Sequence, residues 1–178
     1  MLVFRPVERG NWNDFASLFE APGGPKFCWC MTWRASAGDS HDTDGSARRR
    51  QMADRIERGV PVGLLAYLGD RPVAWVSIAP RDTYRPLGGP KAEPDEVIWS
   101  LACMFTPREL RGHGLGHHII AAAADHARAN GATILEAYPV DPDAPSYRFM
   151  GFVPAFERAG FVEIGMAGSR RHVMRLAL

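Results

Sequence analysis

The chain has 178 residues, a length that suits one domain with a sizeable buried core rather than two domains. Its 21 Lys and Arg nearly cancel its 20 Asp and Glu, so no overall charge would hold nucleic acid or a membrane surface. We find no apolar run of membrane-spanning length, no signal-peptide pattern and an odd number of cysteines, and we therefore expect a soluble, cytoplasmic protein without a disulfide framework.

The N-terminal quarter predicts a strand and then a helix. Residues 2–7 read LVFRPV, and residues 11–21 place aromatic and aliphatic side chains at helical spacing, with Asn11 or Asn13 as the cap. The segment from 22 to 45 mixes Gly, Pro, Ser and Asp and predicts no regular element.

A second helix and a hairpin follow. Residues 46–59 have helical character, with Ser46 as the expected cap and Gly59 as the stop. Residues 61–81 contain two apolar runs joined by Gly69 and Asp70, a two-residue connection that favours an antiparallel hairpin.

The central part of the chain predicts a loop, a buried strand and a helix. Residues 81–95 are rich in Pro and Gly and should form a surface loop, whereas residues 96–106 are almost wholly apolar, as in a strand covered on both faces. An alanine-rich helix comes next and ends at Gly131; its apolar stripe is Leu115, Ile119, Ala123 and Ala127.

The C-terminal part predicts a strand at 132–140, a short helix at 153–160, and strands at 161–165 and 171–178. The sequence therefore predicts an α+β domain: a mixed sheet of about seven strands with helices on both faces.

A glycine-rich stretch, RGHGLGHH from Arg111 to His118, lies between the buried strand and the alanine-rich helix. Glycines allow close approach to backbone amides, and a helix start offers unpaired N–H groups, so the context suits a pyrophosphate. A Walker loop would need Lys and Ser or Thr after Gly116, and a dinucleotide fingerprint would need Gly where His117 stands.

The pattern that fits is (Gln or Arg)-x-x-Gly-x-(Gly or Ala), met by Arg111, Gly114 and Gly116, and it resembles the acyl-CoA loop of the GNAT N-acetyltransferase superfamily. The opening FRPVERGNWNDFASLF, the hairpin, the buried strand and the closing FERAGF before VEIG resemble that family in order as well. The resemblance implies a GNAT-like, mostly antiparallel sheet and acetyl-CoA as co-substrate. It further implies that Met104 and Phe105 pair with the pantetheine arm, and that the pyrophosphate is held by Arg111, Gly112, His113, Gly114, Leu115 and Gly116.

Two positions depart from the family pattern. The Tyr that protonates the CoA thiolate in many members is Phe156 here, a cofactor-site position without a proton to donate, and the usual strand Glu is replaced by Trp99 or Ser100. Candidate catalytic residues are therefore Ser100 and two hydroxyls that could substitute, Tyr138 and Tyr147; packing is the alternative for both tyrosines.

The other reactive side chains favour structural roles. His113 and His117 lack a third ligand, so no metal is expected, and Cys103 lies in an apolar strand where its thiol should stay protonated. The arginines of the second helix favour a solvated face.

The stretch FCWCMTWR, residues 27–34, contains two thiols, a thioether and three rings. Whether extended or helical, it would present an aromatic, sulfur-rich surface, and Trp29 and Trp33 are expected either to pack in the core or, with the loop 81–95, to line an acceptor pocket.

The resemblance implies acetyl transfer from CoA to a primary amine by direct attack in a ternary complex. The acceptor is a small-molecule amine or a protein amino group, and a homodimer is possible. Two alternatives remain: a non-catalytic acyl-CoA sensor, and a zinc or redox protein that uses the cysteines.

Overall fold

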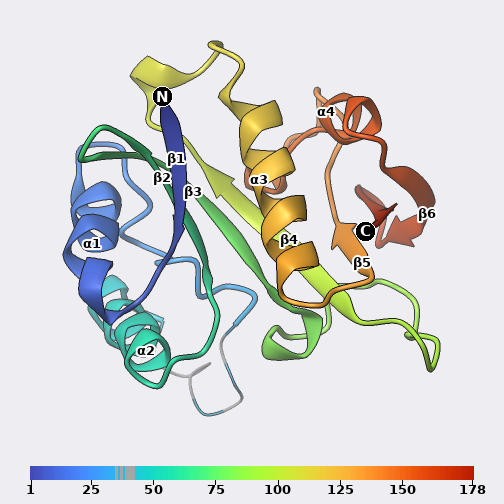
Figure 1. Cartoon of the computed structure of the whole chain (residues 1–178), viewed down its shortest axis with the longest axis horizontal. Helices are drawn as coiled ribbons and strands as arrows, with labels where there is room; N and C mark the ends of the chain where they lie inside the picture. Colours follow the sequence, from blue (N-terminus) through green and yellow to red (C-terminus); the bar gives the residue numbers. More distant parts are fainter. Residues whose placement is uncertain (35, 37, 39–42) are drawn as a thin grey trace.

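The computed structural model describes residues 1–34, 36, 38 and 43–178, and its centre is one seven-stranded sheet (Figure 1). The strand order is β1-β2-β3-β4-β5-β7-β6; β4 and β5 run parallel, and the other neighbours run antiparallel. The strands are β1 (Leu2–Pro6), β2 (Gly63–Leu68), β3 (Arg71–Pro80), β4 (Ile98–Phe105), β5 (Ile134–Ala137), β6 (Val162–Ala167) and β7 (Arg171–Ala177). The predicted α+β class is confirmed.

Helices cover both faces of the sheet (Figure 1). They are α1 (Trp12–Glu20), α2 (Gly45–Glu57), α3 (Leu115–Ala129) and α4 (Val153–Arg158). Alternate residues of β2 divide between two cores, because successive side chains of a strand point to opposite faces. Leu65 and Tyr67 pack with α1 and α2, while Leu64 and Ala66 pack in the core that contains α3 and α4.

The sheet opens between its two parallel strands. Pairing of β4 with β5 ends at Leu101 and Ala137, although β4 continues to Phe105. On its other side β4 contains a bulge: Ser77 of β3 faces Cys103, the next residue faces Leu101, and Ala102 is therefore an extra residue. The last peptide groups of β4 are left without a strand partner on the β5 side among the described residues.

Two local expectations were wrong. Asp44, not Ser46, caps α2, because its carboxylate accepts a hydrogen bond from the Ala47 amide at 2.9 Å. The loop 81–95 runs outside the sheet, but it is not wholly exposed, since two of its own side chains, Tyr84 and Leu87, are buried.

Candidate functional site

The glycine loop gives α3 an open N-terminus. Gly112 and Gly114 have φ of 80° and 75°, values that favour glycine, and Gly114 caps the helix without a side-chain hydrogen bond. Arg111 is fixed beside the loop because its Nε donates to the Thr106 carbonyl at 2.9 Å. The first amides of α3 therefore lie beside a guanidinium, an arrangement suited to a pyrophosphate.

A groove of about 540 Å³ runs from this helix start along the unpaired end of β4. We call it the groove, and its lining residues come from β4, the glycine loop, α3, the segment before α4 and α4 itself. Met104, Phe105, Arg111 and Gly116, all predicted to bind the cofactor, belong to the lining. Phe156 does not; it is fully buried behind Gly151, where a Cβ would lie 2.7 Å from its ring and 2.6 Å from Met104.

Gly116 has no structural reason to be glycine. It is helical without a positive φ, and a Cβ added to it would meet nothing within 4 Å. Glycine inside a helix costs roughly 1 kcal/mol relative to alanine. Gly116 lines the groove, so the space that it leaves adjoins the groove.

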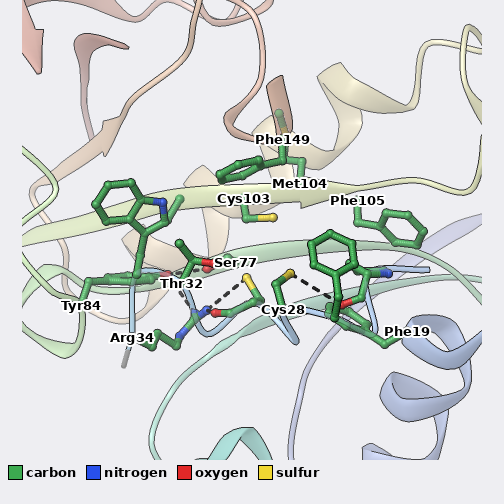
Figure 2. Close-up of a pocket in the computed structure, with 15 residues that line it drawn as sticks. Phe19, Cys28, Thr32, Arg34, Ser77, Tyr84, Cys103, Met104, Phe105 and Phe149 are labelled. Carbon is green, nitrogen blue, oxygen red and sulfur yellow. Dashed lines mark hydrogen bonds between the residues drawn. The ribbon is translucent and has the colours of Figure 1, made fainter. Parts of the chain in front are cut away.

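A second hollow, which we call the cavity, adjoins the groove and measures about 140 Å³ (Figure 2). Met104, Phe105 and Phe149 line both spaces, so the groove leads to the cavity at the end of β4. The remaining described lining residues of the cavity are Phe19, Pro25, Phe27, Cys28, Cys30, Thr32, Trp33, Arg34, Ser77, Tyr84, Ala102 and Cys103.

Arg34 is 4% exposed and forms one wall of the cavity. Its Nη1 donates to the Cys30 carbonyl at 2.9 Å and lies 3.3 Å from the Cys30 sulfur; its Nη2 donates to the Val62 carbonyl and to the Tyr84 hydroxyl, the latter at 3.0 Å. No carboxylate in the described part of the chain pairs with this guanidinium.

The Arg34 guanidinium favours a negative charge on the sulfur of Cys30. A hydrogen bond with the Cys103 thiol and the charge of Arg34 lower the pKa of Cys30 to about 5, although burial alone would raise it. The same hydrogen bond and burial raise the pKa of Cys103 well above its ordinary value. Figure 2 shows Cys103 projecting from β4 toward the segment that contains Cys28. These effects favour the thiolate form of Cys30 beside Arg34 and the protonated form of Cys103.

We expect iodoacetamide to alkylate Cys30 selectively at about pH 6, where an ordinary thiol with a pKa of about 8.5 is almost wholly protonated. Burial raises the pKa of Cys28, so Cys28 is an internal control in the same peptide. Peptide mass spectrometry would follow each rate against pH. The assignment fails if all three thiols react with one midpoint near that of a free thiol.

The stretch 27–34 is neither extended nor helical but a series of turns. Trp29 and Cys30 have positive φ, 48° and 56°, so the alternation expected of a strand does not apply. Trp29 is 2% exposed and stacks on Phe19 and Trp12, with centroid distances of 5.4 and 6.0 Å. Trp33 lines the cavity. The two predicted acceptor residues thus separate into one core residue and one pocket residue.

The hydroxyls predicted to act in catalysis do not line the cavity or the groove. Tyr138 is fully buried, donates to Glu136 Oε1 at 2.6 Å, and shares a 2.8 Å hydrogen bond with Ser100. Burial and the Glu136 charge raise the pKa of Tyr138 well above its ordinary value. Tyr147 is 38% exposed, with the Arg171 guanidinium 5.3 Å from its ring centroid. The structure does not bring the three hydroxyls together at the lining.

Several lining residues were not found from the sequence. Arg34 carries no local signal, because a buried arginine looks like an exposed one in a sequence. Phe149 could have been suspected, since it lies in the segment that follows the open end of β5, where loops border sites. Tyr84 lies within the loop already predicted to border the acceptor.

Comparisons with known proteins agree with this geometry. The model described as "Acetyltransferase (GNAT) family" matches residues 27–152. The chain therefore belongs to the GNAT acetyltransferase family. No curated protein matches it.

Solved structures share the fold at low sequence identity. A ribosomal-protein-alanine N-acetyltransferase from Brucella melitensis is 19% identical with a TM-score of 0.58, covering 99% of both chains. A spermidine N-acetyltransferase from Vibrio cholerae, in complex with CoA and spermine, is 13% identical with a TM-score of 0.61, covering 99% of this chain and 95% of that one. An aminoglycoside acetyltransferase in complex with coenzyme A is 13% identical with a TM-score of 0.60 and the same coverage.

The described residues contain neither a membrane-spanning helix nor a cluster of metal-binding side chains. No helix there is long and apolar enough to cross a bilayer. No group of three or more His, Cys, Asp or Glu within that part could hold a metal ion.

Proposed function

We propose that this protein transfers an acetyl group from acetyl-CoA to a primary amine by direct attack in a ternary complex. The observation that carries the proposal is the junction of the groove and the cavity at Met104, Phe105 and Phe149. The groove suits a pyrophosphate at the start of α3 and a pantetheine arm along β4. The cavity then lies where the thioester would end, with room for an acceptor.

The chain's own groups contribute mainly by binding and positioning. Unpaired peptide groups at the end of β4 can hydrogen-bond the pantetheine amides and orient the thioester at the cavity. No carboxylate or imidazole lies among the described lining residues of the cavity to take a proton from the amine. A thiol with a pKa of about 8.5 leaves readily near neutral pH, so rate depends less on an acid for the CoA sulfur.

A thiol-release assay with acetyl-CoA and a broad amine panel tests this function, together with a thermal shift with CoA. Release that depends on both an amine and acetyl-CoA, with parallel stabilisation by CoA, supports it. Stabilisation by CoA without release by any amine would favour the alternative, a non-catalytic acyl-CoA sensor. That alternative is motivated by Phe156 and by the missing strand Glu. Absence of CoA binding would remove both.

We expect Tyr138→Phe to act on stability more than on turnover. The change removes the hydroxyl that joins Glu136 and Ser100, so the free energy of unfolding should fall by about 1–3 kcal/mol. A proton donor would instead cost about 100-fold or more in kcat. Urea denaturation and kcat of the same variant separate the roles; a 100-fold loss of kcat at unchanged stability would make Tyr138 catalytic.

Trp29 and Trp33 form a matched pair for alanine substitution. Trp29→Ala should cost about 3–5 kcal/mol of stability, because it empties a packed site between aromatic rings. Trp33→Ala should cost less stability but raise the acceptor KM about tenfold, the equivalent of 1.4 kcal/mol in binding. Equal effects of the two variants on acceptor KM would contradict this division.

A further inference from the structure

The size of the cavity limits the acceptor. Its volume is about 140 Å³, and an apolar cavity of about 150 Å³ is enough to hold one benzene ring. Aromatic side chains form much of its wall, and two of them, Phe27 and Phe149, are 71% and 42% exposed. Exposed apolar groups around a hollow mark a binding site for an apolar ligand. The shape therefore suits a single ring.

The charge of the cavity limits the acceptor further. Arg34 is the one Lys or Arg among its described lining residues, no Asp or Glu is among them, and the Cys30 sulfur already lies 3.3 Å from that guanidinium. An ammonium that entered would lose water without gaining a free anion, and burying an unpaired charge is costly. It would also need to lose a proton before attack, and the described lining residues include no carboxylate or imidazole to take it.

We infer that the acceptor is a small arylamine: a primary amine attached directly to a single aromatic ring and uncharged at neutral pH. This inference rests on the proposed acetyl transfer. The nitrogen lone pair attacks the thioester carbonyl, a C–N bond forms and the C–S bond breaks. The proton lost by nitrogen ends on the CoA sulfur, so the products are the N-acetylarylamine and CoA. No proton has to leave the amine before attack, which agrees with the absence of a carboxylate or an imidazole from the described lining.

Steady-state kinetics with four amines test the inference. Aniline and benzylamine both contain an aromatic ring, but near neutral pH aniline is uncharged and benzylamine is an ammonium. Spermidine and kanamycin are polycations without an aromatic ring. We expect kcat/KM for aniline to exceed that for each polycation by about 100-fold or more, and that for benzylamine by about tenfold or more near neutral pH. Between about pH 6 and pH 8 the aniline value should stay nearly constant, while the benzylamine value should rise about tenfold per pH unit as its neutral fraction grows.

A variant assigns the effect to the cavity. Phe27→Ala should raise the aniline KM severalfold and leave the acetyl-CoA KM unchanged, and the strongly exposed ring makes loss of folding a minor effect. Val162→Ala is the control, since Val162 is similarly exposed, at 67%, on the edge strand β6. It should change neither constant.

The outcomes separate this inference from the proposed function. Preferred turnover of spermidine or kanamycin, or a flat pH profile for benzylamine with a rate above that of aniline, would overturn the arylamine class but leave acetyl transfer standing. If no amine is turned over while CoA still stabilises the protein, the proposed function itself fails. Saturable aniline binding to the CoA complex, measured by a ligand-observed NMR titration, would in that case still favour the ring-binding cavity, and no binding would refute it.

Discussion

Replacing Arg34 with methionine should lower the free energy of unfolding by about 3–5 kcal/mol, as expected when one partner of a buried ion pair is removed. The guanidinium joins three parts of the chain: the turn at Cys30, the approach to β2 at Val62, and the loop residue Tyr84. Its loss leaves two buried carbonyls with fewer partners and removes the cation that lies 3.3 Å from the Cys30 sulfur. Urea denaturation would measure the change.

Two further variants make the Arg34 prediction specific. Arg9→Met removes a surface pair, since Arg9 and Glu57 are largely exposed, and should cost less than about 1 kcal/mol. The double variant Arg34→Met, Cys30→Ala should be less destabilised than the sum of its single changes, because no thiolate is left unpaired. If Arg34→Met lowers the free energy of unfolding no more than Arg9→Met does, the buried contacts of Arg34 do not stabilise the fold as described.

Gly116→Ala should stabilise the protein and, at the same time, weaken its binding of acetyl-CoA. The added methyl group meets nothing within 4 Å, and alanine is favoured over glycine in a helix by up to about 1 kcal/mol, so the melting temperature should stay level or rise. Because Gly116 lines the groove, the same methyl group would take up space at the groove. We expect the acetyl-CoA KM to rise about tenfold or more, a loss of about 1.4 kcal/mol in binding.

Gly10→Ala is the matched control for Gly116→Ala. Gly10 also has open space around its Cβ position and no positive φ, but it lies in the turn before α1, outside the lining of the groove. It should leave the acetyl-CoA KM unchanged. Opposite effects on stability and KM at Gly116 alone would identify a residue kept small for a ligand, whereas an unchanged KM would argue that the pyrophosphate binds elsewhere.

The sheet and the glycine loop could be predicted from the sequence because their signals are local. Alternation, apolar runs and turn residues predicted all seven strands, and the hairpin turn at Gly69 and Asp70 was placed correctly. Gly112 and Gly114 indeed have the left-handed backbone that only glycine adopts at little cost. The cap of α2 was misassigned because Asp44 and Ser46 are both good caps two residues apart, and only the hydrogen bond to Ala47 distinguishes them.

The conformation of the stretch 27–34 could not be predicted from such local patterns. Its side chains follow no helical or strand period, because left-handed residues at Trp29 and Cys30 turn the chain twice in succession. Sequence alone therefore left Trp29 and Trp33 as equivalent candidates. In the fold, Trp29 packs in the core with the aromatic residues of α1, while Trp33 lines the cavity.

The sequence by itself determined that this is a GNAT-type domain and predicted a pyrophosphate loop at Arg111–Gly116, since those features depend on residues close together in the chain. Only the tertiary structure decided which side chains line the cavity and which charges lie beside it. Cys30 and Cys103 are 73 positions apart in sequence numbering, and Tyr84 lies 50 residues beyond Arg34, yet their ionisation depends on these contacts. A hydrogen bond between distant segments has no sequence period, so the contacts of Arg34 with the Cys30 sulfur and the Tyr84 hydroxyl near the cavity could be seen only in the folded chain.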